Sequence, residues 1–183
     1  MCQSNRVLTR GILGKGGEVD ERVEVVHFGT YNIQNSHNGG LELALRGIYQ
    51  ANFDLVLLQD TKITDGVYAQ DSTGFSVVTS DALIRHHGGL TLFYKESPRF
   101  EVEYHQQQST NIISFQLVMG GQHWHVVGCH LVSRNASTLE SIVTAINHRP
   151  RSAELLVVGD FNTALESPYC NKYAEVITVA MTT

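Results

Sequence analysis

The sequence predicts an α/β protein built as a four-layer α-β-β-α sandwich, in which two packed mixed sheets carry helices on their outer faces. Two short, continuous apolar segments, 54–59 and 154–159, are typical of strands buried on both faces. Two further segments, 41–48 and 139–146, repeat apolar residues at helical spacing. Two sheets with helices outside would bury all of these apolar faces.

The first predicted strand covers residues 23–31, where β-branched and aromatic residues dominate until the polar segment 35–40 interrupts them. The helix at 41–48 and the buried strand at 54–59 follow. In the later segment 100–104, apolar residues alternate with glutamates, which predicts one solvated face. The strand-like segments after the first helix and its following strand are 75–79, 89–94, 100–104, 111–118 and 123–130.

The second predicted helix begins at a capping box, with Ser137 as N-cap and Glu140 three residues later. Pro150 ends it, because proline cannot continue a helix. The strand at 154–159 closes the predicted order. A last apolar segment at 176–180 has no assigned type.

Length and composition are those of an ordinary globular domain. The 183 residues correspond to about one domain at ~150 residues each, and we expect it to span residues 23–183. Hydrophobic residues make up 42% and charged residues 17%, which excludes disordered and collagen-like classes. No segment approaches the ~20 apolar residues of a transmembrane helix, so no membrane partner is expected. The net charge of −5 excludes a global basic field, but a nuclease stays open because a carboxylate-rich metal site adds negative charge.

Residues 1–17 contain three basic residues, four glycines and no acidic residue. Their apolar content is too low for a signal peptide and their serine content is low for a mitochondrial transit peptide. Residues 1–22 are therefore predicted to be a flexible leader. The three cysteines are irregularly spaced, which predicts neither a disulfide framework nor a zinc site and indicates a reducing, intracellular compartment, the nucleus included.

Polar residues stand where three predicted strands end. Asn32 follows the first strand and Asp60 follows the second, while Asp160 and Asn162 follow the last. Binding sites gather where the strands of open sheets end. The oxygens of Asn32, Asp60 and Asp160 are ligands of the kind that Mg²⁺ or Mn²⁺ prefers, which predicts a shared divalent-cation site. The alternative for Asn32, Asp160 and Asn162 is that they only cap the backbone of local turns.

Two other polar groups stay open to two interpretations. His123 and His125 lie two apart on one strand, which fits a zinc pair or, since no third ligand is evident, an exposed edge face. Segment 85–89 fits a phosphate-facing loop, because glycines let backbone N–H groups approach an anion, or a tight turn before a strand.

Five motifs in one order resemble those of the endonuclease/exonuclease/phosphatase superfamily over about residues 25–165. The nearest resemblance is to the endonuclease domain of fungal non-LTR retrotransposons. It implies the sandwich fold, a Mg²⁺ or Mn²⁺ cofactor, DNA as partner and hydrolysis of phosphodiester bonds. The motifs are T-Y-N-I at 30–33, L-L-Q-D-T-K at 57–62, R-H-H-G-G-L at 85–90, H-V-V-G-C-H at 125–130 and V-V-G-D-F-N at 157–162.

The resemblance also implies a role for each site residue. Asn32 and Asp60 fall at the metal-site asparagine and acid. Asp160 falls at the aspartate that orients or activates the attacking water, and Asn162 at the asparagine that contacts the phosphate. His130 stands where the family often has a tyrosine and is predicted as a further catalytic residue.

Three departures from the family pattern predict slow DNA cleavage or none. Asp60 is one methylene shorter than the usual glutamate, and His130 offers an imidazole in place of a phenol. No S-D-H motif follows Asn162, so the general-base histidine, its partner aspartate and the last strands are expected to be missing. The alternative functions are an inactive retroelement remnant or binding module, and a phosphatase of the same superfamily.

Overall fold

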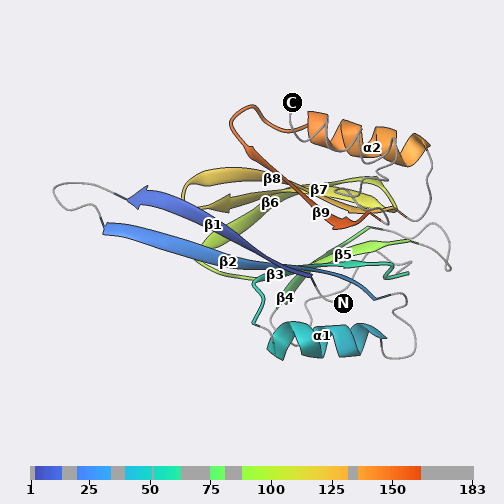
Figure 1. The fold of residues 1–183 in the computed structure, drawn as a ribbon, viewed down its shortest axis with the longest axis horizontal. Coiled ribbons are helices and arrows are strands. Elements are labelled where there is room, and N and C mark those ends of the chain that lie inside the picture. The colour runs from blue at the N-terminus through green and yellow to red at the C-terminus, as the bar shows by residue number, and fades with distance from the viewer. Residues whose placement is uncertain are drawn as a thin grey trace, which may run out of the picture.

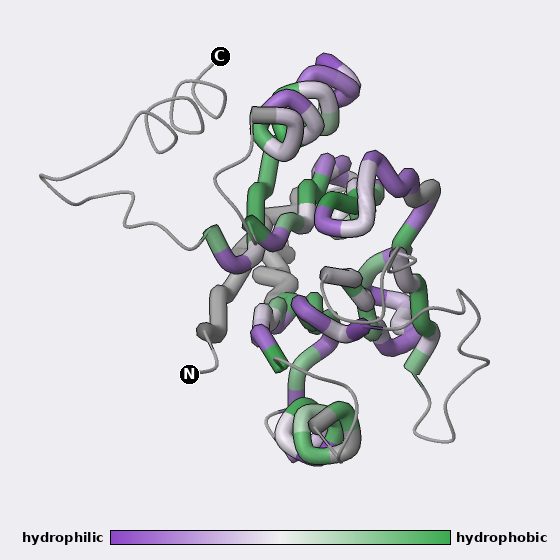
Figure 2. Tube along the Cα trace, turned by 90° about the vertical axis from the view of Figure 1, so that its right-hand side faces the viewer, coloured by the Kyte–Doolittle hydropathy of each residue, from purple (hydrophilic) through white to green (hydrophobic). Residues whose placement is uncertain are grey.

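The computed structural model shows two sheets packed face to face, with one helix on each outer side (Figure 1). Figure 2 shows the same layers from the side, with α1 and α2 at opposite extremes and the sheets between them. This confirms the predicted four-layer α/β sandwich. The described residues are 3–13, 20–33, 40–50, 52–62, 75–80, 88–131 and 136–161.

The first sheet has the strand order β1-β2-β3-β5-β4. Its central strand β3 pairs parallel with β2 and antiparallel with β5, so the sheet is mixed as predicted. All five residues of β3 are buried, because alternate side chains face the second sheet and the helix α1. The strands are β1 (Gln3–Leu13), β2 (Asp20–Asn32), β3 (Leu55–Gln59), β4 (Phe75–Thr79) and β5 (Leu90–Lys95).

The second sheet has the order β6-β7-β8-β9, and its only parallel pair among the described strands is β8 with β9. The prediction that 154–159 is buried on both faces is only partly right. Val157 and Val158 are buried, but the other residues of β9 are partly or fully exposed, because β9 pairs with β8 alone among the described strands. The strands are β6 (Phe100–Ser109), β7 (Ile112–Met119), β8 (Gln122–His130) and β9 (Glu154–Asp160).

Each helix packs an apolar face against its sheet. The helix α1 (Gly40–Gln50) buries Ala44 and Ile48, and α2 (Ala136–Asn147) buries Ile142 and Ile146. Burial of such a side chain stabilises the fold by about 1.5–3 kcal/mol. The structure places the start of α2 at Ala136, so the predicted N-cap Ser137 lies inside the first turn. No helix among the described residues is long and apolar enough to cross a membrane.

The N-terminal segment differs from the predicted flexible leader. Residues 3–13 form β1, which pairs antiparallel with β2 from Gln3 opposite Thr30 to Leu13 opposite Asp20. Charge and glycine content predict a leader. The edge of β2, however, offers backbone N–H and carbonyl groups with which this segment pairs, and composition does not reveal such pairing. Only Phe28 and later residues of β2 also pair with β3, and Figure 1 shows the β1–β2 ribbon extending beyond the sandwich. The apolar segment 176–180 lies outside the described residues.

His125 lies beneath α2 and is only 3% exposed, so the predicted exposed face is correct for His123 but wrong for His125. Its Nε2 donates to the Ala145 carbonyl at 2.8 Å, and its Nδ1 accepts from Gln116 Nε2 at 2.8 Å. The neutral ring therefore uses both nitrogens. Burial lowers the pKa of His125; the Ala145 hydrogen bond opposes this, and the nearby charges of His148 and Arg149 lower the pKa further.

The first prediction is that His125 makes folding sensitive to mild acid. Its pKa is lower in the folded chain than its ordinary value of 6.5, so the unfolded chain binds the proton first as pH falls. This contribution to stability is complete above about pH 7 and is lost as pH falls through the unfolded value toward the folded one. In thermal melts, the fall of Tm between about pH 8 and pH 5.5 should be smaller in His125→Gln than in the unmodified chain. His123→Gln, a change of an exposed histidine on the same strand, should keep the full fall; equal slopes in both variants would contradict the assignment.

Candidate active site

The ends of three strands meet at one end of the sandwich. Asn32 ends β2, His130 ends β8 and Asp160 ends β9. The Asn32 Nδ2 donates to Asp160 Oδ2 at 2.9 Å and lies 3.3 Å from His130 Nε2. These residues, here called the strand-end trio, join the first sheet to the second. The structure therefore brings together three residues that the sequence predicts for one site.

The geometry assigns the protons of the trio. The Asn32 amide has two N–H bonds, so it serves Asp160 and His130 together, and His130 Nε2 must accept. The proton of the neutral imidazole then lies on Nδ1, which is buried and has no hydrogen-bond partner among the described residues. Burial lowers the pKa of His130, against the smaller raising effects of Asp160 and Asp60, so the ring is neutral near pH 7.

Asp60 lies close enough to the trio for its negative charge to raise the pKa of His130. Its carboxylate, however, contacts groups outside the trio. Its Oδ1 accepts from the Gly88 N–H at 3.2 Å, and its Oδ2 lies 3.5 Å from Lys62 Nζ. Asp60 has a φ of 57°, in the left-handed region that aspartate tolerates better than most residues. The pairing with Lys62 is a feature of the site that the sequence analysis missed, although L-L-Q-D-T-K places both charges together.

Gly88 and Gly89 form a second loop at the site, with φ values of 87° and 90° that favour glycine. Both of their N–H groups are used inside the protein, by Asp60 Oδ1 at 3.2 Å and by the Thr110 carbonyl at 3.0 Å. At these two positions the structure therefore favours the tight turn over the phosphate-facing loop. Residues 85–87 lie outside the described part of the chain.

Backbone hydrogen bonds link these loops into one platform. The Thr61 and Lys62 N–H groups donate to the carbonyls of Gly89 and Gly88 at 3.2 and 3.0 Å. Across the second sheet, His130 N donates to the Asn111 carbonyl at 2.9 Å. Leu131 N donates to the backbone carbonyl of Asp160, a residue of the trio, at 2.8 Å.

A buried glutamine holds the ends of β2 and β3 in register. Gln59 is 1% exposed, and its Nε2 donates to Thr30 Oγ1 and to the Leu57 carbonyl. The backbone carbonyl of Gln59 accepts a hydrogen bond from Ile33 N at 3.1 Å. Since Gln59 directly precedes Asp60, these bonds set the separation of Asp60 from Asn32 on the neighbouring strand. The sequence alone does not reveal this supporting role of Gln59, because a glutamine beside an apolar segment carries no distinctive local signal.

The donor set suits a hard divalent cation, with two carboxylates and one amide oxygen-bearing group near the strand ends. Among the described residues, no group of three or more His, Cys, Asp or Glu is spaced to hold a metal ion. Asn32, Asp60 and Asp160 offer two carboxylates and one amide, the donor types through which Mg²⁺ is bound while it keeps several waters. Asn162, the fourth predicted oxygen-bearing residue, lies outside the described residues.

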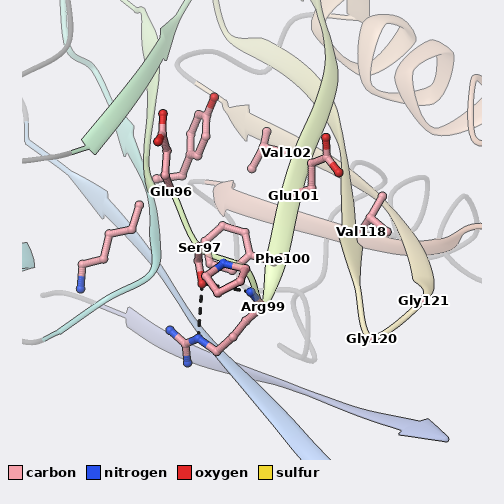
Figure 3. A pocket seen from close by; sticks show the side chains of 12 residues that line it. Glu96, Ser97, Arg99, Phe100, Glu101, Val102, Val118, Gly120 and Gly121 are labelled. Atoms are coloured by element: carbon pink, nitrogen blue, oxygen red, sulfur yellow. Dashed lines mark hydrogen bonds between the residues drawn. The ribbon is translucent and has the colours of Figure 1, made fainter. Parts of the chain in front are cut away.

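A separate pocket of about 520 Å³ lies at the opposite end of the sandwich (Figure 3). It is bounded by the connection between β5 and β6 and by the β7–β8 turn, with Phe100, Val102 and Val118 on its apolar side. Arg99 stands at its edge, where it pairs with the buried Asp54 at 2.5 Å. No residue of the strand-end trio lines this pocket, so it is not part of the candidate site.

Solved structures show the same fold at low sequence identity. The endonuclease domain of TRAS1, a telomere-specific non-LTR retrotransposon, matches with a TM-score of 0.61 and 17% identity, over 84% of this chain and 69% of that one. An endonuclease/exonuclease/phosphatase family protein from Leptotrichia buccalis matches with a TM-score of 0.59 and 18% identity, over 84% and 72%. The 3′ phosphatase NExo from Neisseria, bound to a product DNA hairpin, matches with a TM-score of 0.60 and 13% identity, over 85% and 69%.

These likenesses identify the fold. The chain has the fold of the endonuclease/exonuclease/phosphatase superfamily, as its ordered motifs predict. It spans between 69% and 72% of the length of these three solved chains. No protein-family model matches the sequence, and no curated protein matches it.

The second prediction concerns Gly159, which precedes Asp160 and has a φ of 143°. A Cβ at this position would lie 1.8 Å from the Cys129 carbonyl oxygen on the paired strand β8, so the backbone would have to move. Gly159→Ala should destabilise the fold by more than about 1 kcal/mol in urea denaturation. Gly47→Ala is the matched control, because the helix α1 leaves open space there, and it should stabilise by about 0.5–1 kcal/mol. Equal stabilities of both variants would refute the strained contact.

Proposed function

We propose that this chain hydrolyses phosphodiester bonds in DNA with the help of Mg²⁺ or Mn²⁺. The observation that carries the proposal is the strand-end trio, because it gathers an asparagine, an aspartate and a neutral histidine from three strands. His130 is 5% exposed, and a buried polar ring is costly for stability unless its polar atoms are hydrogen-bonded. The position of the trio at the strand ends, on a fold shared with nucleases and phosphatases, supports a catalytic site.

Asp160 is the proposed base for the attacking water. Its Oδ2 is held by the Asn32 amide, so the carboxylate has a fixed orientation before substrate binds. Sequence analysis places His130 among the catalytic residues, but its burial and its contact with Asn32 favour a positioning role. Asn162 keeps the proposed role of a donor to the phosphoryl oxygens.

Asn32, Asp60 and Asp160 are the residues that would hold the divalent ion. When bound, such an ion neutralises charge on the scissile phosphate and polarises it. The protein would contribute by keeping the side-chain oxygens of Asn32, Asp60 and Asp160 close together. It does so through the Asn32–Asp160 hydrogen bond and the Gln59 contacts.

DNA is the proposed partner because solved structures with the same fold include an endonuclease domain and a phosphatase bound to DNA. TRAS1 contributes an endonuclease domain, and NExo is bound to a product DNA hairpin. With DNA as partner, the proposed location of the protein is inside the cell, in the nucleus. The net charge of −5 argues that affinity for DNA comes from a few local contacts rather than from an extended basic surface.

A non-catalytic binding module is the second candidate function. The contacts of Asp60 favour it, because its two carboxylate oxygens face Gly88 and Lys62. A carboxylate engaged in this way holds a divalent ion less readily than one directed to solvent. The two candidates differ in whether a bound strand is cut.

The third prediction is slow, Mg²⁺-dependent nicking of a supercoiled plasmid by the folded chain. Loss of a general base typically costs ~10²–10⁴-fold, so Asp160→Ala should reduce the rate by at least about 100-fold. Glu101→Ala removes the same charge from an exposed site on β6 at the other end of the sandwich and should leave the rate unchanged. Folded protein that binds DNA without nicking it would instead support the binding module.

The fourth prediction concerns metal binding without turnover. An ion that binds only the folded state raises Tm by mass action, with about 2.7 kcal/mol of stabilisation at 100 times the dissociation constant. Mg²⁺ should therefore raise Tm of the unmodified chain, and Asp60→Asn should weaken this response. Glu101→Gln should respond like the unmodified chain. A Mg²⁺ response that persists unchanged in Asp60→Asn would remove Asp60 from the proposed ligands.

A further inference from the structure

Lys62 places a positive charge beside the proposed metal acid. Its Nζ lies 3.5 Å from Asp60 Oδ2, and each of the two side chains is 17% exposed. The pair is thus largely shielded from solvent and yet reaches the surface of the site. Because screening by salt is weaker for partly buried charges than for fully exposed ones, this ammonium contributes a persistent local field.

The backbone around Lys62 is held in a conformation that lysine rarely adopts. Its φ is 54°, and that of Asp60 is 57°, both in the left-handed region. That region costs an ordinary L-residue roughly 1–2 kcal/mol, and lysine lacks the short polar side chain that eases it for asparagine or aspartate. The hydrogen bond from Lys62 N to the Gly88 carbonyl at 3.0 Å holds the turn. Conformations of this kind persist where the surroundings enforce them, and they gather at ligand sites.

Asp60 connects the Lys62 ammonium electrostatically to the strand-end trio. Lys62 pairs with Asp60, and the charge of Asp60 in turn acts on His130 of the trio. The residue that the sequence predicts as a metal ligand therefore already faces a cation of the chain itself. A divalent ion arriving at Asp60 would share its carboxylate with this ammonium.

We propose that Lys62 serves as a resident cation that binds a phosphate group of a nucleic-acid strand at this site in the absence of a divalent ion. The inference rests on the proposed function, because it places the same substrate class at the same site. An ammonium carries three N–H donors on a flexible stem and binds phosphate as a point charge. Two consequences follow: Lys62 strengthens metal-free binding of the strand, and it weakens binding of Mg²⁺ to Asp60.

Lys95 provides a matched control for the charge of Lys62. It lies on β5 at the opposite end of the sandwich, where its Nζ donates to Asn52 Oδ1 at 2.9 Å and lies 5.6 Å from the centre of the Phe75 ring. Lys62→Met and Lys95→Met therefore change the net charge of the chain equally. Any difference between them reports the position of the charge rather than its amount.

The experiment measures binding of a fluorescent single-stranded oligothymidylate in EDTA across a range of salt concentrations. Lys62→Met should weaken binding by about threefold to tenfold. It should also reduce the steepness of the salt dependence by about 0.7 in a log–log plot, the value for one lost phosphate contact on a single strand. Lys62→Arg should keep both properties, and Lys95→Met should change neither. Lys62→Asn, which tolerates the left-handed backbone, replaces Lys62→Met if that variant does not fold.

A second measurement follows Mg²⁺ without DNA. In Lys62→Met, the Mg²⁺-induced rise in Tm should begin at a lower Mg²⁺ concentration than in the unmodified chain or in Lys95→Met. An unchanged salt slope in Lys62→Met, or equal weakening by Lys62→Met and Lys95→Met, would overturn the inference. Failure of the unmodified chain to nick DNA would overturn the proposed hydrolysis but not this inference, because strand binding in EDTA is independent of turnover.

Discussion

The hydrogen bond from Asn32 to Asp160 is the contact on which the rest of the site depends. It joins the last residue of a strand in one sheet to the last residue of a strand in the other, across a sequence separation of 128 residues. The packed core behind it sets the spacing of the sheets, with residues such as Leu57, Ile113 and Val126 buried between them. Because this core is close-packed and stiff, the two strand ends meet in one defined arrangement.

The same packing keeps the His130 ring and the Cys129 thiol uncharged. His130 is 5% exposed, and burial lowers its pKa, so the ring acts as an uncharged acceptor toward Asn32. Burial also raises the pKa of the Cys129 thiol to about 12, and the charge of Asp160 adds to this effect. The strand β8 thus presents two uncharged groups beside one carboxylate. The negative charge of the trio is concentrated on Asp160, where a cation or a water proton would be received.

The loops around the trio combine strain with backbone hydrogen bonds. Asp60, Lys62, Gly88 and Gly89 all have positive φ values. The Lys62 N–H donates to the Gly88 carbonyl, the Gly88 N–H to Asp60 Oδ1 and the Gly89 N–H to the Thr110 carbonyl. No single bond here is strong, since each contributes about 0.5–1.5 kcal/mol net. Acting together, they hold the Asp60 carboxylate and the backbone of Lys62 in place.

Local pattern was sufficient to predict the described strands other than β1, both described helices and the layering, because apolar periodicity depends only on neighbouring residues and on which faces must leave water. It also identified Asn32 and Asp160, since polar residues at the ends of buried strands are visible in the sequence alone, whereas His130 was predicted from the resemblance of the motifs to a known superfamily. Composition failed for residues 3–13, where pairing with β2 rather than charge content produces a strand. Only the tertiary structure revealed the burial of His125 under α2, the engagement of Asp60 with Gly88 and Lys62, and the neutral ring of His130. These features arise from contacts between residues far apart in the chain or from desolvation by the assembled layers, and neither quantity is carried by a local segment.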